Sequence, residues 1–301
     1  MKILITGSDG QLGEALKRTN PGKNECIFCK KNELDILNQK DSETLISKLK
    51  PDWIINTAAF TEVDKAEELK KLTFQINTEA PKNLCEILNK YGGRLLQIST
   101  DFVFNGQQSH PYSFDDNVDP ISVYGASKAQ AEKHILNYHG HIILRTSWLY
   151  SDFGKNFLRT MLELQKKNLS TNQPLKVISD QVGTPTSAYS LANLCWEIVG
   201  SNKLERSKTS IFHWSDSGLA SWYDFAHAIG DLSLRNGIIS KFPLVIPILS
   251  KDFNSKALRP KYSVLNCYHT QKFFNIKSSH WRDELDKVLK KLVLNSPNYK
   301  I

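Results

Sequence analysis

An apolar strand followed at once by three evenly spaced glycines opens this chain and constrains its fold more than any other feature. The run Lys2 to Thr6 reads KILIT, and Gly7, Gly10 and Gly13 follow it. Glycine at a strand-to-helix turn allows a tight bend and a close approach of the backbone to a bound pyrophosphate. The free amides and dipole at the start of the next helix favour the same anion. The loop therefore predicts a dinucleotide site, although an ordinary strand-to-helix turn can share this pattern.

Short apolar runs alternate with amphipathic stretches through the first half of the chain. The strand candidates after the first are 25–29, 52–56, 94–99 and 141–145. Runs that are apolar throughout are typical of parallel strands buried on both faces. The sequence therefore predicts an α/β protein with a doubly wound Rossmann-type parallel sheet. The long helical segment 63–90 is expected to break at Pro81.

The second half is less regular and predicts a smaller C-terminal α/β substrate-binding domain. We expect residues 1–150 with 176–200 to form the NAD(P)-binding domain, and residues 151–175 with 201–301 to form the substrate domain. Helices are expected at 156–167, 187–199, 221–234 and 281–294, and short strands at 176–178 and 211–214. No linker marks the boundary near Tyr150, so the two parts are interleaved.

Composition limits the class of partner and the compartment. The net charge is +8, but the lysines are scattered and form no long basic run, which favours a basic surface over nucleic-acid binding. The chain has five cysteines at wide spacings, and CIFC at 26–29 reads as a buried strand with structural thiols. No apolar run is long enough to span a membrane or form a signal peptide. These features predict a cytoplasmic protein with no membrane partner.

Tyr124 and Lys128 are four residues apart in VYGASK, with Ser99, Thr100 and Asp101 upstream in QISTD. Residues at i and i+4 share one face of a helix. A cation beside a phenol lowers the phenol's pKa and makes it a better proton donor near neutrality. Such a pair also arises by chance, so it gains meaning only beside the glycine loop and Thr100 at a strand end.

The residues after the second strand bear on the choice of cofactor. Lys30 and Lys31 stand where an acid would bind the ribose hydroxyl of NAD, and basic residues there accommodate the 2′-phosphate of NADPH. The sequence therefore favours NADPH and leaves NADH open, since both lysines could also be plain surface charges. Asp35 and Ile36 are candidates for contact with the adenine.

Longer motifs carry a resemblance to a known family. TGSDGQLG, INTAAFTEVDKAE, ISTDFVFNG, YGASKAQAE, LRTSWLYSDFGKNF, DQVGTPTS and LRPKYSVL occur in this order from Lys2 to the final helix. Together they resemble the extended short-chain dehydrogenase/reductases and, within them, the dTDP-4-dehydrorhamnose reductases. The resemblance implies NADPH-dependent reduction of the 4-keto group of a dTDP-6-deoxy-hexulose to dTDP-L-rhamnose, the last step in making this precursor of surface polysaccharide.

The resemblance also implies roles for individual residues. Tyr124 would donate the proton, Lys128 would hold the nicotinamide ribose and lower the pKa of Tyr124, and Thr100 would orient the substrate oxygen. Asn77 would support Lys128 through water, and Arg145 with the residues after it would contact the nicotinamide or the sugar. The expected cofactor residues are Gly7, Asp9, Gly10, Gln11, Leu12, Gly13, Lys30, Lys31, Asp35, Ile36, Ala58, Ala59, Asn77, Ser99, Tyr124 and Lys128. The expected substrate residues are Thr100, Asp101, Phe102, Trp148, Asn156, Gln181, Thr184 and Arg259.

Two positions depart from the family pattern, and several alternatives stay open. Phe102 replaces the family's tyrosine and Asn105 its aspartate, so a hydroxyl that could touch the substrate is lost. A sugar-nucleotide epimerase or dehydratase on the same fold is one alternative, although the second acid of dehydratases is missing after Asp101. A non-catalytic regulatory subunit is another. No metal site is expected among the scattered histidines; Mg²⁺ at a homodimer contact, for instance at Glu14, is left open.

Overall fold

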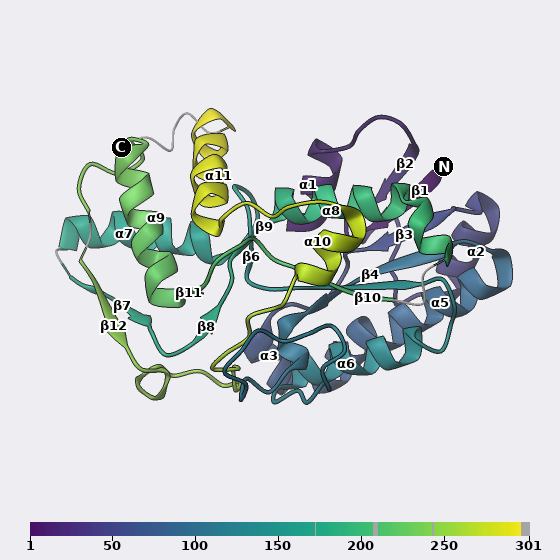
Figure 1. Ribbon diagram of the computed structural model, residues 1–301, viewed down its shortest axis with the longest axis horizontal. Helices are drawn as coiled ribbons and strands as arrows, with labels where there is room; N and C mark the ends of the chain where they lie inside the picture. The colour runs from purple at the N-terminus through teal and green to yellow at the C-terminus, as the bar shows by residue number, and fades with distance from the viewer. Residues whose placement is uncertain (172, 207–209, 243, 296–301) are drawn as a thin grey trace.

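The protein is built around a six-stranded parallel sheet, seen in the computed structural model in Figure 1, which describes residues 1–171, 173–206, 210–242 and 244–295. The strand order is β10-β5-β4-β3-β1-β2, and every neighbouring pair is parallel. The strands are β1 (Lys2–Thr6), β2 (Glu25–Cys29), β3 (Trp53–Asn56), β4 (Arg94–Thr100), β5 (Ile142–Thr146) and β10 (Ile211–Trp214). This arrangement confirms the expected Rossmann-type fold.

Helices cover both faces of the sheet, which explains why its strands are apolar throughout. On one face lie α1 (Gln11–Arg18) and α8 (Ala188–Gly200); on the other lie α2 (Gln39–Leu49), α5 (Ala80–Tyr91) and α6 (Val123–Ile135). Successive side chains of a strand point to opposite faces. Ile3 and Ile5 accordingly pack into the core beneath α1 and α8, whereas Leu4 packs into the core beneath α2 and α5.

The edge strand β2 differs from the expectation. Only Cys29 is buried along it, so the interpretation of CIFC as a buried strand is wrong. An edge strand has a neighbour on one side only, and its outer side chains remain partly exposed. All five cysteines are free thiols.

A smaller α/β part adjoins the carboxyl edge of the sheet (Figure 1). Its helices are α7 (Phe157–Thr171), α9 (Trp222–Arg235) and α11 (Trp281–Asn295). Three two-stranded sheets join it: β7 (Leu175–Ile178) with β12 (Val245–Ile248), β8 (Val182–Gly183) with β11 (Ala220–Ser221), and β6 (Leu149–Tyr150) with β9 (Thr186–Ser187). A further helix, α10 (Tyr268–Phe274), packs against β10 and was missed by the sequence reasoning.

Three elements depart from the expected plan. The strand β10 belongs to the main sheet although it comes from the stretch assigned to the substrate domain, and β7 lies in a small sheet although it was assigned to the other domain. The segment 63–90 does not break at Pro81. It divides into α3 (Val63–Glu68), α4 (Lys70–Phe74), a π-helical turn at Gln75–Glu79 and α5. Pro81 lies in the first turn of α5, where its missing N–H matters least.

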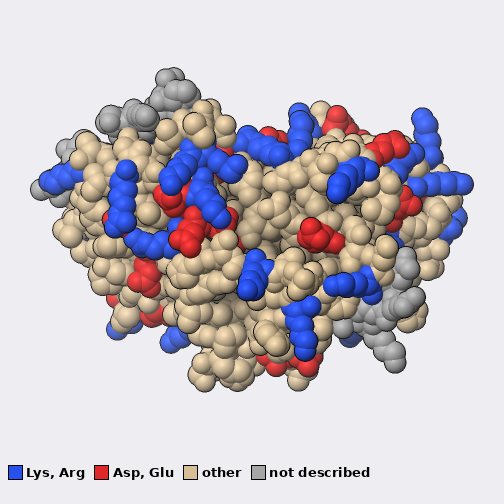
Figure 2. Space-filling model, turned by 45° about the horizontal axis from the view of Figure 1, so that its top comes forward, with Lys and Arg blue, Asp and Glu red and all other residues tan. Residues whose placement is uncertain are grey.

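The surface carries both signs of charge. Figure 2 shows Lys and Arg side chains spread over the visible face with Asp and Glu between them. No helix within the described ranges is long and apolar enough to cross a membrane.

Candidate active site

A cleft of about 610 Å³ lies where the carboxyl ends of β1, β3 and β4 face the smaller part of the protein. In a doubly wound sheet, loops diverge at such a switch in strand order and leave a crevice for ligands. From the sheet side, the cleft is lined by the glycine loop, the turn after β3, the end of β4 and the start of α6. From the other side it is lined by Trp148, Asn156, Trp222 and Arg259.

The glycine loop lies so close to its neighbours that larger residues would not fit. Gly7 has φ of +61°, and a Cβ there would lie 2.8 Å from the backbone nitrogen of Ala58. A Cβ on Gly13 would lie 2.5 Å from the carbonyl oxygen of Gly7. Asp9, Gly10, Gln11 and Leu12 line the cleft, as do Ala58 and Ala59. The loop therefore presents free backbone to the cleft at the start of α1, as a bound pyrophosphate requires.

The catalytic candidates meet at the opposite wall of the cleft. The Ser122 side chain caps α6, so that Tyr124 and Lys128 lie on its first two turns. Thr100, at the end of β4, is hydrogen-bonded to the Tyr124 side chain. Lys128 Nζ donates to the carbonyl oxygen of Ile98 at 2.6 Å. The ring of Phe102 meets that of Tyr124 edge-on, with 5.7 Å between the centroids.

The expected lowering of the Tyr124 pKa is not found. Burial raises the pKa of Tyr124 to about 12, while the hydrogen bond with Thr100 acts in the opposite direction. Burial also lowers the pKa of Lys128 to about 8, because a charged amine loses hydration there. Because the Lys128 ammonium donates to a backbone carbonyl oxygen, burial is the largest influence on the pKa of the Tyr124 phenol.

Behind these residues lies a buried ion pair. Arg145 Nη2 donates to Glu132 Oε2 at 2.7 Å, and Arg145 Nε reaches both carboxylate oxygens. Both side chains are nearly inaccessible, at 3% and 4% exposure. Ser99 donates to the same carboxylate. The expectation that Arg145 contacts nicotinamide or sugar is therefore wrong: it lies behind the cleft and joins β5 to α6.

An aromatic pair forms the wall on the side of the smaller part. The rings of Trp148 and Trp222 stack in parallel, 3.5 Å between centroids. On its other side, Trp148 packs on Gly183, where a Cβ would fall 2.6 Å from the indole. Trp148 has φ of +44°, an unusual value for a bulky residue. Gln181 accepts a hydrogen bond from Trp222 Nε1 at 3.2 Å and so fixes the wall from behind.

Trp222 was missed as a site residue by the sequence reasoning. It was assigned only to a helix, and a tryptophan at a helix start resembles a core residue. The capping box formed by Ser221 and Asp224 marks the start of the helix. From it, Trp222 could have been placed in the first turn, at the end of the helix that faces the cleft.

Polar contacts connect the cofactor loop to the substrate side. Gln11 Oε1 accepts hydrogen bonds from Ser151 Oγ and Asn156 Nδ2, each at 2.9 Å. At the mouth, Arg259 Nη2 donates to Asp64 Oδ2 at 2.6 Å, and this contact lowers the pKa of Asp64 to about 2. Lys155 also lines the cleft and was missed, although it stands inside the motif LRTSWLYSDFGKNF, in which only Arg145 with the residues after it and Asn156 were given roles.

Several expected residues lie outside the cleft. Lys30 and Lys31 are exposed beyond the end of β2. An acid is also present there, since Glu33 accepts a hydrogen bond from the Lys30 N–H at 2.7 Å. Asp35 accepts from the Leu37 N–H, and Ile36 is buried. Asn77 is hydrogen-bonded to Phe60 and Ser127.

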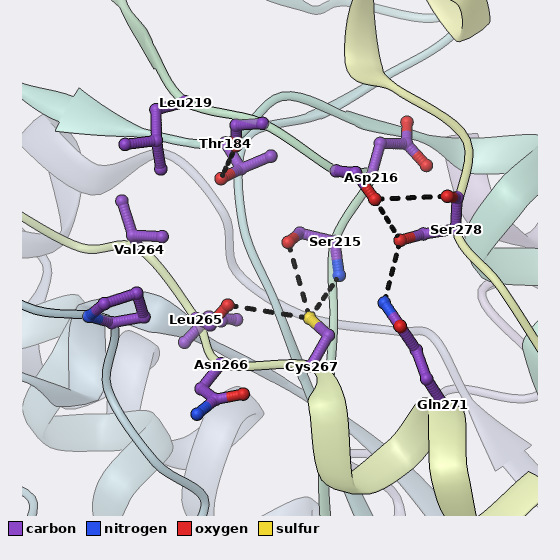
Figure 3. Close-up of a pocket in the computed structure, with 13 residues that line it drawn as sticks. Thr184, Ser215, Asp216, Leu219, Val264, Leu265, Asn266, Cys267, Gln271 and Ser278 are labelled. Atoms are coloured by element: carbon purple, nitrogen blue, oxygen red, sulfur yellow. Dashed lines mark hydrogen bonds between the residues drawn. The ribbon is translucent and has the colours of Figure 1, made fainter.

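Thr184 lines a different pocket, of about 330 Å³ (Figure 3). Its hydroxyl donates to the carbonyl oxygen of Gly218 at 2.9 Å. In the same pocket, Cys267 Sγ accepts from the Ser215 N–H at 3.2 Å and Gln271 donates to Ser278 Oγ at 3.0 Å. Neither the glycine loop nor Tyr124 lines this pocket.

Comparisons with known proteins agree with this geometry. The family model described as RmlD substrate binding domain matches residues 1–294. A dTDP-4-dehydrorhamnose reductase of Aggregatibacter actinomycetemcomitans is 36% identical over 291 residues, covering 95% of this chain and 98% of that protein.

Solved structures give the same result. A dTDP-4-dehydrorhamnose reductase from Clostridium acetobutylicum has a TM-score of 0.88 and 37% identity, covering 97% of this chain and 99% of that one. The Bacillus anthracis dTDP-4-dehydrorhamnose reductase, solved in complex with NADP, has a TM-score of 0.86 and 31% identity, covering 96% of this chain and 99% of that one.

Proposed function

This chain belongs to the family of the RmlD substrate binding domain model, and from that premise we propose that it is an NADPH-dependent dTDP-4-dehydrorhamnose reductase. It reduces the 4-keto group of dTDP-4-dehydro-L-rhamnose to give dTDP-L-rhamnose, a precursor for surface polysaccharide. The observation that carries the proposal is the meeting of Thr100, Tyr124 and Lys128 in one cleft with the glycine loop.

The residues of the cleft fit a nicotinamide dinucleotide. Gly7 and Gly13 leave space that a Cβ would fill, and the free amides at the start of α1 suit a pyrophosphate. Lys128 would hold the nicotinamide ribose, with Ala58 and Ala59 along the channel. Lys30 and Lys31 are free to turn toward a 2′-phosphate from the end of β2. When bound, the cofactor supplies the hydride.

The chain's own residues handle the proton and the developing charge. Hydride addition to a ketone leaves an alkoxide, which must be stabilised and protonated. Tyr124 donates its hydroxyl proton to that oxygen, and Thr100 hydrogen-bonds the same oxygen and holds it in place. Lys128 lies one helical turn from Tyr124, where it would hold the nicotinamide ribose beside the phenol.

The sugar nucleotide enters from the side of the smaller part. Trp148 and Trp222 form an apolar wall against which a sugar ring can pack, with Gln181 behind them. Arg259, Lys155 and Asn156 supply the donors that a diphosphate needs at the mouth. Phe102 presents only an apolar ring to the substrate, and Asp101, next to it in the chain, also lines the cleft.

The wider organisation follows from this role. We assign residues 1–150 with 176–200 chiefly to cofactor binding and residues 151–175 with 201–301 chiefly to the sugar nucleotide, with β7 and β10 exchanged between them. The protein would act in the cytoplasm, where NADPH is available, on a small-molecule partner and as a homodimer. Glu14, a candidate for a metal-dependent dimer contact, pairs with Arg18 at 2.9 Å.

The test is turnover of the purified protein with NADPH and the dTDP-4-keto-L-sugar, made in situ by an upstream dehydratase and epimerase. Absorbance of the reduced cofactor should fall in the presence of the sugar nucleotide. Tyr124→Phe should lose roughly 10²–10⁴-fold in kcat, because it lacks the acidic proton.

Tyr268→Phe is the matched control, since Tyr268 is 68% exposed and outside the cleft. It should keep the wild-type rate. If wild-type oxidation of NADPH were no faster than that of Tyr124→Phe, the reductase assignment would be refuted.

A further inference from the structure

Asp101 is a buried acid directly beside the catalytic residues, and the described mechanism leaves it without a task. The residue is 1% exposed, although it borders the cleft. Its Oδ1 lies 3.1 Å from Thr100 Oγ1, and Ser263 and the backbone N–H groups of Asp101 and Phe102 also hydrogen-bond the carboxyl group. Its Oδ2 has no hydrogen-bond partner and no basic side chain pairs with it in the ranges that the structure describes. Burial without a counter-ion disfavours the charged carboxylate more than these hydrogen bonds favour it, so the neutral acid is stabilised here.

The protonation state of Asp101 determines in which direction the hydrogen bonds at Thr100 can run. A threonine hydroxyl has one proton to donate and two lone pairs that accept. One lone pair of Thr100 Oγ1 accepts the Phe102 N–H at 3.2 Å. If Asp101 is ionised it can only accept a hydrogen bond, so Thr100 must donate its single proton to Asp101. Thr100 can then only accept from Tyr124, and that bond turns the Tyr124 proton away from the substrate.

When Asp101 is a neutral acid, the hydrogen bond between Asp101 and Thr100 runs in the opposite direction. An acid proton on Oδ1 is donated to the second lone pair of Thr100, and the Thr100 proton becomes free for the substrate oxygen. The Tyr124 proton is free as well. In addition, a negative charge on Asp101 raises the pKa of Tyr124, so the neutral form leaves Tyr124 a better acid.

We propose that Asp101 acts as a neutral carboxylic acid that donates a hydrogen bond to Thr100 and thereby directs the Thr100 and Tyr124 protons to the substrate oxygen. Asp101 is thus a positioning residue of the proposed reduction and rests on that function. Burial raises its pKa to about 7, so its ionisation falls within the working range of pH. The neighbouring elements carry other ionisable groups, namely Tyr124, Lys128 and Glu132 on α6, Asp119 before it, and Arg259, Lys261 and Tyr262 beside Ser263.

The pH dependence of kcat tests the proposal, because a purely structural aspartate would not shape it. For the wild type, kcat should be level near pH 6 and fall about tenfold per unit above pH 7. Asp101→Asn keeps a donor for Thr100 and cannot ionise, so its kcat should stay level from pH 6 up to the Lys128 pKa of about 8 and lie within about tenfold of wild type at pH 6. Asp101→Leu removes the donor and should lose roughly 10²-fold or more.

Asp216→Asn is the matched control. Asp216 is also buried, with a pKa raised to about 7, but it lies in the second pocket (Figure 3). This variant should keep the wild-type pH profile. Binding of NADPH, followed by its fluorescence, checks that each variant is folded.

A wild-type kcat that stays level from pH 6 to 9 overturns the proposal even if no variant folds. So does an Asp101→Asn variant that binds NADPH but is as inactive as Asp101→Leu. Turnover by the wild type at pH 6 separately tests the reductase function, so failure of the two ideas can be distinguished.

Discussion

The buried ion pair between Glu132 and Arg145 should be one of the most sensitive points of the fold. Glu132→Gln keeps the shape of the side chain and removes its charge, which leaves the Arg145 guanidinium at 3% exposure without a counter-ion. Besides the amide oxygen of the new glutamine, the guanidinium has the carbonyl oxygen of Phe114 at 3.2 Å as an acceptor, with His213 Nε2 equally near, and none of these carries a negative charge. Breaking a buried pair by removing one partner costs about 3–5 kcal/mol.

That cost is large compared with the total stability of about 5–15 kcal/mol expected for a folded domain. It corresponds to a fall in the thermal midpoint on the order of 10 °C for a protein of this size. Calorimetry or circular dichroism at constant pH and NADPH concentration would measure it. NADPH must be fixed because a ligand that binds the folded state raises the midpoint by itself.

Two further variants separate this explanation from a general effect of mutation. Lys290→Gln breaks an exposed pair, Lys290 to Asp286, and should change stability by less than about 1 kcal/mol. Glu132→Leu combined with Arg145→Met removes both charges and should be less destabilised than Glu132→Gln. A Glu132→Gln midpoint within about 2 °C of wild type would refute the reasoning.

Three more outcomes are expected. Asp64→Asn removes the carboxylate that holds Arg259 in place at the mouth of the cleft, so steady-state kinetics should show a KM for the sugar nucleotide raised about tenfold with little change in kcat. Glu68→Gln, on the same helix, should have a smaller effect. Gly7→Ala should weaken NADPH binding at least tenfold in a fluorescence titration, because its Cβ would meet Ala58 at 2.8 Å; Gly22→Ala, also at positive φ but with open space around it, should not. Burial lowers the pKa of His141 to about 4, so its stabilising contribution is complete above pH 6.5 and is lost as pH falls toward 4; His141→Gln should show a weaker fall in thermal midpoint over that interval, and equal slopes would contradict this.

Local patterns were sufficient for most of the sheet and for part of the site. The strand Lys2–Thr6 and the helix after the glycines were predicted because each is determined by neighbouring residues. The positions of Tyr124 and Lys128 follow from helical spacing in the same way. The break at Pro81 was predicted wrongly, because a proline in the first turn of a helix is compatible with either side of a boundary.

The sequence by itself determined the parallel sheet, the glycine loop and the family, since apolar periodicity and ordered motifs are properties of the chain alone. Only the tertiary structure decided which side chains face the cleft. Arg145 follows a strand end as a ligand residue would, yet a carboxylate from α6 holds it behind the cleft. Trp222 and Asp64 reach the site from segments 74 and 195 residues away from their partners Trp148 and Arg259. The ionisation of Asp101 likewise depends on burial, which no run of neighbouring residues specifies.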